Sequence, residues 1–163
     1  MLTSLDIQTT NEIKLKILDN LQANILKFHQ RREAYHLFVR FTKEIDRIKT
    51  WIQGYAQERV TSAARQVGIN SKNGGVNNTG ELLSCFFLSA DGYRALGYLN
   101  NQLSEQPFQD SSFLNGMKAR QNCYFKQQDQ WWTIDNKDPL SKDWQNFYQG
   151  KIHTMLLLSD FQL

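Results

Sequence analysis

The sequence predicts an α+β fold, and three patterns along the chain carry that prediction. Residues 34–41 alternate between two faces with aromatic and β-branched side chains, as in a strand that has one face on a core. Apolar residues then recur near helical spacing over residues 44–66, which predicts one long amphipathic helix. Residues 82–88 form a nearly continuous apolar run, which is typical of a central strand buried on both faces.

Shorter signals predict the remaining elements. Residues 19–26 favour a short helical turn packed under the domain. Ser89 is expected to cap the helix that follows the central strand, because a serine side chain can accept a hydrogen bond from the first turn. The buried stripe of that helix is expected to be Tyr93, Leu96 and Leu99.

Length and composition bound the class of protein. A chain of 163 residues fits one domain with a core, and we expect a polar N-terminal segment over 1–20 followed by the domain at 21–163. The net charge is only +3 and no basic run exceeds Arg31-Arg32, so no nucleic-acid partner is expected. No apolar run approaches the length of a membrane span, and the N-terminus lacks the pattern of a secretory signal, so we expect a cytoplasmic protein without a membrane partner.

Cys85 and Cys123 are the only cysteines in the sequence. In a chain without a signal for export, two cysteines are expected to be reduced thiols. Cys85 lies inside the apolar run 82–88 and is interpreted as a small buried hydrophobic residue.

Five segments resemble, in order, the motifs of a known family. They read LQANILK and then HLFVRF within 21–41, LSADGYRALG at 88–97, FLNGMKAR at 113–120, DPLSKDW at 138–144 and KIHTMLLLSD at 151–160. Together they resemble the N-terminal half of the dye-decolourising (DyP-type) haem peroxidases. The resemblance implies a further strand over residues 151–160, where the family has a similar strand. Ala23 stands where that family usually has glycine.

The resemblance implies a ferredoxin-like domain of the dimeric α/β-barrel type, with an antiparallel sheet and packed helices, incomplete at its C-terminal side. It also implies haem as the cofactor of full-length relatives, which oxidise dyes and phenolic compounds with hydrogen peroxide. The family's catalytic G-x-x-D-G motif does not occur in this sequence, and the family's segment with the proximal histidine is not matched. We therefore expect a truncated or split peroxidase that is inactive alone and does not bind haem tightly, and we assign no catalytic residue and no metal ligand.

His153 and Arg120 are the weak candidates for contact with haem. His153 lies on the expected last strand and could ligate iron, as could His36, but a hydrogen-bonded structural histidine is the favoured interpretation. Arg120 could approach a haem propionate, against the alternative of a surface or interdomain salt bridge. His29, among basic neighbours, is expected to be a solvated loop residue.

Two other functions stay open at this point. The chain could be a non-enzymatic ferredoxin-like module for assembly, since an incomplete sheet leaves an edge for a C-terminal half or a second copy. It could also be a haem-handling dimer related to the chlorite dismutases, with His153 as ligand. Trp131 and Trp132 favour core or interface packing over transfer of electrons from a dye.

Overall fold

The computed structural model describes residues 11–29, 31–42, 44–68, 81–99, 110–116, 123–127, 130–134 and 139–160. The chain divides into two compact units. The first unit combines residues 1–39, 46–87 and 155–163, and the second combines residues 40–45 and 88–154. Among the described helices, none is both long enough and apolar enough to cross a bilayer.

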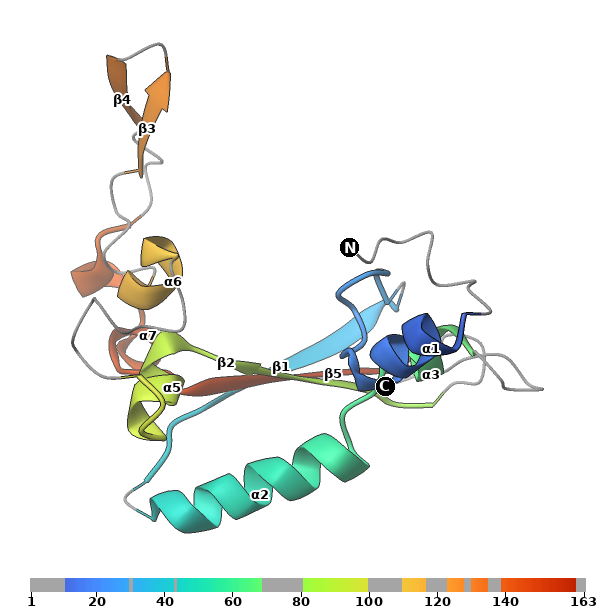
Figure 1. Cartoon of the computed structure of the whole chain (residues 1–163). Helices are drawn as coiled ribbons and strands as arrows, with labels where there is room; N and C mark the ends of the chain where they lie inside the picture. The colour runs from blue at the N-terminus through green and yellow to red at the C-terminus, as the bar shows by residue number, and fades with distance from the viewer. Residues whose placement is uncertain are drawn as a thin grey trace. The chain divides into compact units, whose positions relative to one another are not determined.

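A three-stranded sheet is the centre of the first unit. Its strands are β1 (Glu33–Val39), β2 (Leu83–Leu88) and β5 (Thr154–Asp160), in the spatial order β1-β5-β2. The helix α2 (Ile45–Glu58) connects the two outer strands and lies along one face of the sheet (Figure 1). A strand–helix–strand unit with a third, antiparallel strand between its two strands is the split βαβ arrangement of ferredoxin-like folds. The predicted α+β, ferredoxin-like class is confirmed.

The two faces of β2 carry different layers. On one face, the buried side chains of Leu83 and Cys85 pack with Leu157 of β5 and with Ala23, and Phe87 borders this cluster. A strand was predicted here from the apolar run, and the structure confirms it at residues 83–88 with its first half buried. Its predicted central position is wrong, because β2 is at the end of the described strand order and the middle strand is β5.

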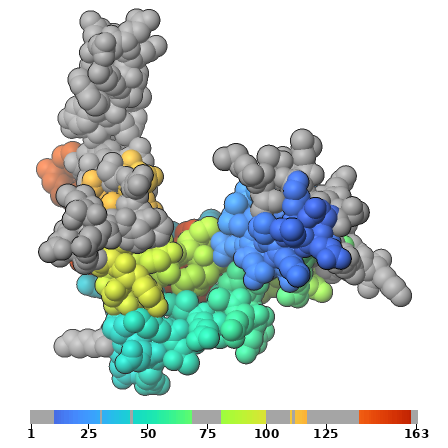
Figure 2. Space-filling view, in the orientation of Figure 1, coloured from blue at the N-terminus to red at the C-terminus, as the bar shows by residue number. Residues whose placement is uncertain are grey.

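On the other face of β2, the aromatic rings of α2 make the contact. The ring centroids of Trp51 and Tyr55 lie 6.2 and 6.1 Å from that of Phe86. The Tyr55 hydroxyl lies 2.7 Å from Ser84 Oγ. No residue of α2 is fully buried, and the space-filling view shows the helix at the surface along its length (Figure 2).

The predicted helical turn at 19–26 is wrong, because the helix comes earlier. The helix α1 (Glu12–Asn20) begins where the side chain of Asn11 accepts hydrogen bonds from two backbone N–H groups of the first turn. Its buried residue Leu18 packs against Ala63 and Ala64 of α3, and the two helices lie side by side (Figure 1). In residues 12–20 the apolar residues alternate with charged ones, so the segment shows only a weak helical pattern. The prediction therefore placed the helical turn too late, on the more apolar residues that follow.

The single long helix predicted over 44–66 is also wrong, because two helices occupy that range. After α2 ends at Glu58, the backbone N–H of Thr61 donates to the Ser84 carbonyl at 2.8 Å, which draws the chain to the edge of β2. Ser62 then caps α3 (Ala63–Val67), since its hydroxyl accepts from the Arg65 N–H at 3.1 Å. The break thus depends on a partner distant in sequence, which helical periodicity does not report.

The strand predicted over 34–41 is present as β1, but its expected apolar core face is not. Residues Glu33–Leu37 are all exposed, with Tyr35 at 57% and Leu37 at 45% of their full accessibility. Phe41, beyond the end of the strand, is buried. Because β1 is the end strand of the sheet, it has a described neighbour on one side only.

The second unit contains short helices and strands and a small buried cluster. They are α5 (Ala90–Ala95), α6 (Ser111–Asn115), β3 (Cys123–Gln127), β4 (Gln130–Ile134), a 3-10 turn (Ser141–Asp143) and α7 (Asn146–Gln149). Ala90, Leu99 and Leu114 are buried together, with Tyr93 and Phe113 against them. The predicted cap is confirmed, because Ser89 Oγ accepts from the Gly92 N–H at 3.0 Å.

Strands β3 and β4 form an antiparallel pair that the sequence patterns did not predict. Phe125 is opposite Trp132 and Lys126 is opposite Trp131 in its register. Aromatic residues at both strands suit a pleated ladder, which is the signal that could have found the hairpin.

Candidate functional site

His153 joins three segments of the second unit. It is buried, and its Nδ1 accepts a hydrogen bond from the backbone N–H of Phe41 at 2.7 Å, while the two rings lie 5.0 Å apart. Its carbonyl oxygen accepts from the Ser89 backbone N–H at 3.1 Å and from Ser89 Oγ at 3.2 Å. The residue that precedes β5 therefore connects Phe41 with Ser89 at the start of α5, within the second unit.

Gly92 makes this junction possible. A Cβ built on Gly92 would overlap the carbonyl oxygen of His153 and would lie 3.1 Å from a methyl carbon of Leu88. Real Cβ atoms do not approach backbone oxygen so closely, so the start of α5 can meet His153 only through a glycine. The close contact with His153 thus explains the glycine at position 92, within the 88–97 segment.

The bonding of His153 fixes its tautomer. An Nδ1 atom that accepts a hydrogen bond carries no proton, so in the neutral ring the proton is on Nε2. Burial lowers the pKa of His153, while Asp91 acts in the opposite direction and Arg40 and Lys151 lower it further. The ring is therefore held neutral with neither nitrogen presenting a lone pair, as in a structural histidine. Its assignment to haem iron stays a prediction.

His29 is not the solvated loop residue expected from its basic neighbours. It is 7% exposed, and its Nδ1 accepts from the Arg31 backbone N–H at 3.0 Å. Its backbone N–H donates to the side chain of Asn24, which has a positive φ of 65°. Burial lowers the pKa of His29, and the charges of Arg31 and His36 act in the same direction. The prediction of a solvated residue was based on the basic neighbours of His29. The residue is buried because side-chain hydrogen bonds close the turn around it.

A buried arginine lies beside this histidine. The Nη1 of Arg31 donates to the Ser159 carbonyl at 2.6 Å and lies 3.9 Å from Asp160 Oδ1, both on β5. Burial lowers the pKa of Arg31, and the Asp160 carboxylate opposes that effect. A buried charge that is paired with an opposite charge holds the two segments in one arrangement, and removal of either partner lowers the stability of the fold. The contact connects the chain before β1 to the end of β5.

Gln66 completes the turn that holds His29. The side chain is 1% exposed, its Oε1 accepts from the Asn24 N–H at 3.0 Å, and its Nε2 donates to the Lys27 carbonyl at 2.9 Å. From the sequence, Gln66 was predicted only to be the last residue of a helix. Its two bonds show that residues 24–27, within the LQANILK segment, are positioned from α3.

Cys85 is an inert thiol, as predicted. It is fully buried, and its Sγ lies 3.5 Å from the Ala23 carbonyl oxygen, to which it can donate. Burial raises the pKa of Cys85 to about 11. A thiol that is protonated and out of contact with solvent is not a nucleophile at neutral pH.

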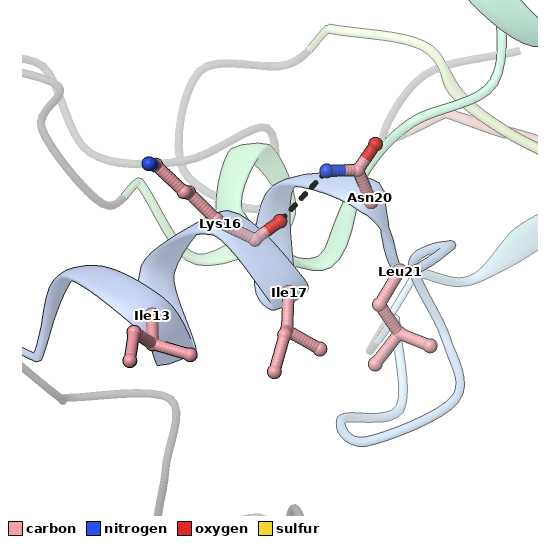
Figure 3. A pocket seen from close by; sticks show the side chains of 5 residues that line it. All are labelled: Ile13, Lys16, Ile17, Asn20 and Leu21. Atoms are coloured by element: carbon pink, nitrogen blue, oxygen red, sulfur yellow. Dashed lines mark hydrogen bonds between the residues drawn. The ribbon is translucent and has the colours of Figure 1, made fainter.

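A shallow hollow of about 390 Å³ lies along α1 (Figure 3). Its lining residues are Ile13, Lys16, Ile17, Asn20 and Leu21. The isoleucines are 71% and 44% exposed, and the Asn20 amide donates to the Lys16 carbonyl at 2.8 Å (Figure 3). One ammonium group and one amide beside apolar carbon offer no acid–base pair and no ligand for iron. The hollow has the chemistry of a contact surface.

No group of three or more histidine, cysteine or acidic side chains that could hold a metal ion occurs in the part of the chain that the structure describes. His29 and His153 both use Nδ1 to hold a backbone N–H, and the imidazole of His36 is on the exposed strand β1. Arg120 lies outside the described residues.

Comparison with known proteins gives structural matches over nearly the whole chain. The DyP-type peroxidase of Anabaena sp. matches 99% of this chain with a TM-score of 0.67 and 29% sequence identity. DyP2 of Amycolatopsis sp. matches 95% with a TM-score of 0.68 and 27% identity. No protein-family profile matches the chain, and no curated protein matches it by sequence.

The matches cover much less of the other proteins. The chain spans 34% of the Anabaena protein and 29% of the Amycolatopsis protein, about one third of each. The resemblance first stated from the sequence motifs is confirmed, as a resemblance to a part of these peroxidases.

Proposed function

We propose that the chain is the N-terminal portion of a DyP-type haem peroxidase, and that it contributes a structural wall to an enzyme whose reacting groups lie elsewhere. The observation that carries this proposal is the match of 99% of the chain to one third of the Anabaena enzyme. The sequence motifs support it independently, since they occur in the family's order from Leu21 to Asp160.

The described side chains support a scaffold role for this portion. A haem peroxidase needs an axial ligand for iron and an acid–base group within reach of bound peroxide. Here the buried histidines accept hydrogen bonds from backbone N–H groups, and the thiol of Cys85 is protonated. The sequence also has no G-x-x-D-G motif. Bound haem would supply the oxidising chemistry of the whole enzyme, with peroxide as oxidant and dyes or phenolic compounds as reductants.

A hemin titration of the purified 163-residue chain tests this proposal, followed by its visible absorbance spectrum and an assay of peroxide-dependent dye oxidation. We expect no saturable one-to-one shift of the Soret band and no turnover. A one-to-one shift with turnover would contradict the proposal, and loss of that shift in His153→Ala would identify the ligand.

A chimaera tests the family assignment separately. The chain replaces its matching third in the Anabaena enzyme, and we expect the chimaera to incorporate haem and to retain some peroxide-dependent activity. The matched control carries Gly54→Ala in α2, where a Cβ would have no heavy atom within 4 Å, and we expect it to take up haem like the unsubstituted chimaera. A chimaera that folds but takes up no haem would contradict the assignment.

A second function is favoured by one specific observation, the exposed end strand β1. An end strand with exposed apolar side chains invites strand addition, which suits a non-enzymatic assembly module. Light scattering with size-exclusion chromatography separates the two functions, since a monomer at all concentrations argues against the module. The cytoplasmic location expected from the sequence stays a prediction, which cell fractionation would test.

A further inference from the structure

The turn of residues 24–29, in the first unit, is closed by side chains. The Asn24 side chain accepts from the His29 N–H at 3.1 Å, and Nδ1 of His29 accepts from the Arg31 N–H at 3.0 Å. The backbone of Asn24 has a positive φ of 65°, a conformation that asparagine tolerates at some cost in free energy. The turn is therefore a strained segment, and its closure depends on a few hydrogen bonds.

The hydrogen bond from Arg31 to His29 requires a neutral imidazole. A histidine nitrogen accepts a hydrogen bond only while it carries no proton, and both nitrogens of an imidazolium are donors. Proton uptake at Nδ1 would therefore bring two N–H groups face to face across the present distance of 3.0 Å. The bond that joins the turn to Arg31 would be replaced by a repulsion.

The charges around His29 also oppose a proton on its ring. Burial lowers the pKa of His29, and the charges of Arg31 and His36 lower it further. The Asp160 carboxylate lies 3.9 Å from Nη1 of Arg31. The Glu81 carboxylate accepts from Arg65 at 2.9 Å. Charged or titratable groups around the turn are Lys27 and Arg31 on its own segment, His36 of β1, Arg65 of α3, Glu81 before β2 and Asp160 of β5.

The imidazole of His29 is buried beneath an exposed aromatic ring. His29 is 7% exposed, and its ring stacks on that of Phe28 with 4.5 Å between the two centroids. Phe28 is itself 66% exposed. Because the side chain that lies over the imidazole is at the surface, a small movement of Phe28 gives water access to His29.

We propose that His29 is an acid-sensitive latch, which holds the turn of residues 24–29 closed at neutral pH and releases it in acid while the sheet stays folded. A proton taken up by Nδ1 of His29 breaks the bond from the Arg31 N–H. Repulsion between the imidazolium and the guanidinium then loosens the contact of Arg31 with β5. The buried cluster of Leu83, Cys85 and Leu157 is apolar, so acid does not act on it directly, and opening of one segment of a folded protein is common.

Amide hydrogen exchange of the full 163-residue chain tests the proposal, measured by NMR between pH 5 and pH 7.5, about the range in which histidine titrates, and corrected for the rates of an unstructured chain. The Arg31 amide reports the latch. The amides of Thr61 and Ser84, which bond to each other's residues, report the sheet. Below the ordinary histidine pKa of 6.5, each pH unit favours the open turn by up to about tenfold, so the opening equilibrium at Arg31 should rise by up to about thirtyfold at pH 5. The opening at Thr61 and Ser84 should change much less.

Two substitutions separate His29 from the other histidines. His29→Asn keeps an acceptor oxygen close to the position of Nδ1 but takes up no proton, so its Arg31 amide should open equally at pH 5 and pH 7.5. His36→Gln is the matched control, because it removes an exposed histidine from the neighbouring strand β1, and most of the rise in opening should remain.

Three results would overturn the proposal. These are an Arg31 opening that does not rise in acid, an equal rise at Arg31, Thr61 and Ser84, which would indicate global unfolding, and a rise that persists in His29→Asn. The nitrogen chemical shifts of the His29 ring in the parent chain give a further test that needs no variant, since a proton on Nδ1 at pH 7.5 would also refute the latch. These measurements involve no haem, so their outcome is independent of the proposed function.

Discussion

Substitution of Gly92 by alanine should destabilise the protein, although alanine is the better helix former. Gly92 lies inside α5, where a change from glycine to alanine would normally stabilise by about 0.5–1 kcal/mol. Here the added methyl group would overlap the His153 carbonyl oxygen, and backbone atoms cannot yield as a flexible side chain can.

The size of the effect follows from the bonds at that carbonyl. It accepts from the backbone N–H and from Oγ of Ser89, at 3.1 and 3.2 Å. Overpacking costs about 1–3 kcal/mol, and each hydrogen bond lost costs about 0.5–1.5 kcal/mol. With both bonds lost and the gain in helix propensity subtracted, we expect Gly92→Ala to lower the free energy of unfolding by about 1–5 kcal/mol.

Gly54→Ala is the matched control for this experiment. Gly54 lies inside α2, and a Cβ there would have no heavy atom within 4 Å, so the same change should stabilise by about 0.5–1 kcal/mol. Urea unfolding followed by circular dichroism measures both variants. Should Gly92→Ala prove as stable as the parent while Gly54→Ala gains stability, the tight junction at His153 would be refuted.

Three further predictions concern buried polar groups. Gln66→Leu should cost about 2–4 kcal/mol in urea unfolding, because two backbone groups lose their partner, and Gln66→Glu should cost no less, because its buried carboxylate would face the Lys27 carbonyl oxygen; a Gln66→Leu variant as stable as the parent would count against this. The pKa values of His29 and His153 are lowered by burial from 6.5, so the unfolded chain binds more protons below that pH, and stability should be complete above about pH 6.5 and fall as the pH drops below it. Thermal unfolding between pH 5 and pH 8, about the range in which histidine titrates, checks this, and a flat profile would contradict it. In a Cys123→Ser background, Cys85 should react with an aromatic disulfide reagent only after unfolding, because burial raises its pKa to about 11; rapid reaction of the native protein would show that it is accessible.

The sequence predicted the elements whose signals are local. The apolar run of β2 and the serine that caps α5 were found because each depends on residues close to one another in the chain. The strand within 151–160 was predicted from the resemblance to a family motif, and β5 begins at Thr154.

The features that were missed depend on partners distant in sequence. The break between α2 and α3 follows from the bond of Thr61 to Ser84, and the burial of His29 follows from a turn that Gln66 holds. Neither bond leaves a trace in periodicity or local charge. The exposure of Tyr35 and Leu37 was missed because an alternating strand shows which side chains share a face but not whether another layer covers that face. Of the candidate residues for haem, His153 is placed in a structural junction, and Arg120 lies outside the described residues.

The order of strands in the sheet also has a consequence for biosynthesis. β5 separates β1 from β2, yet it is the last of the three to be translated. Until β5 leaves the ribosome, β1 and β2 lack the strand with which each forms backbone hydrogen bonds in the folded sheet. The side chains of Leu83 and Cys85 also lack their contact with Leu157. Strand pairing between residues distant in sequence slows folding and prolongs the exposure of aggregation-prone strands. We therefore expect the nascent chain to depend on chaperones until residue 160 has emerged, and ribosome stalling before residue 154 to yield a product that quality control treats as unfolded.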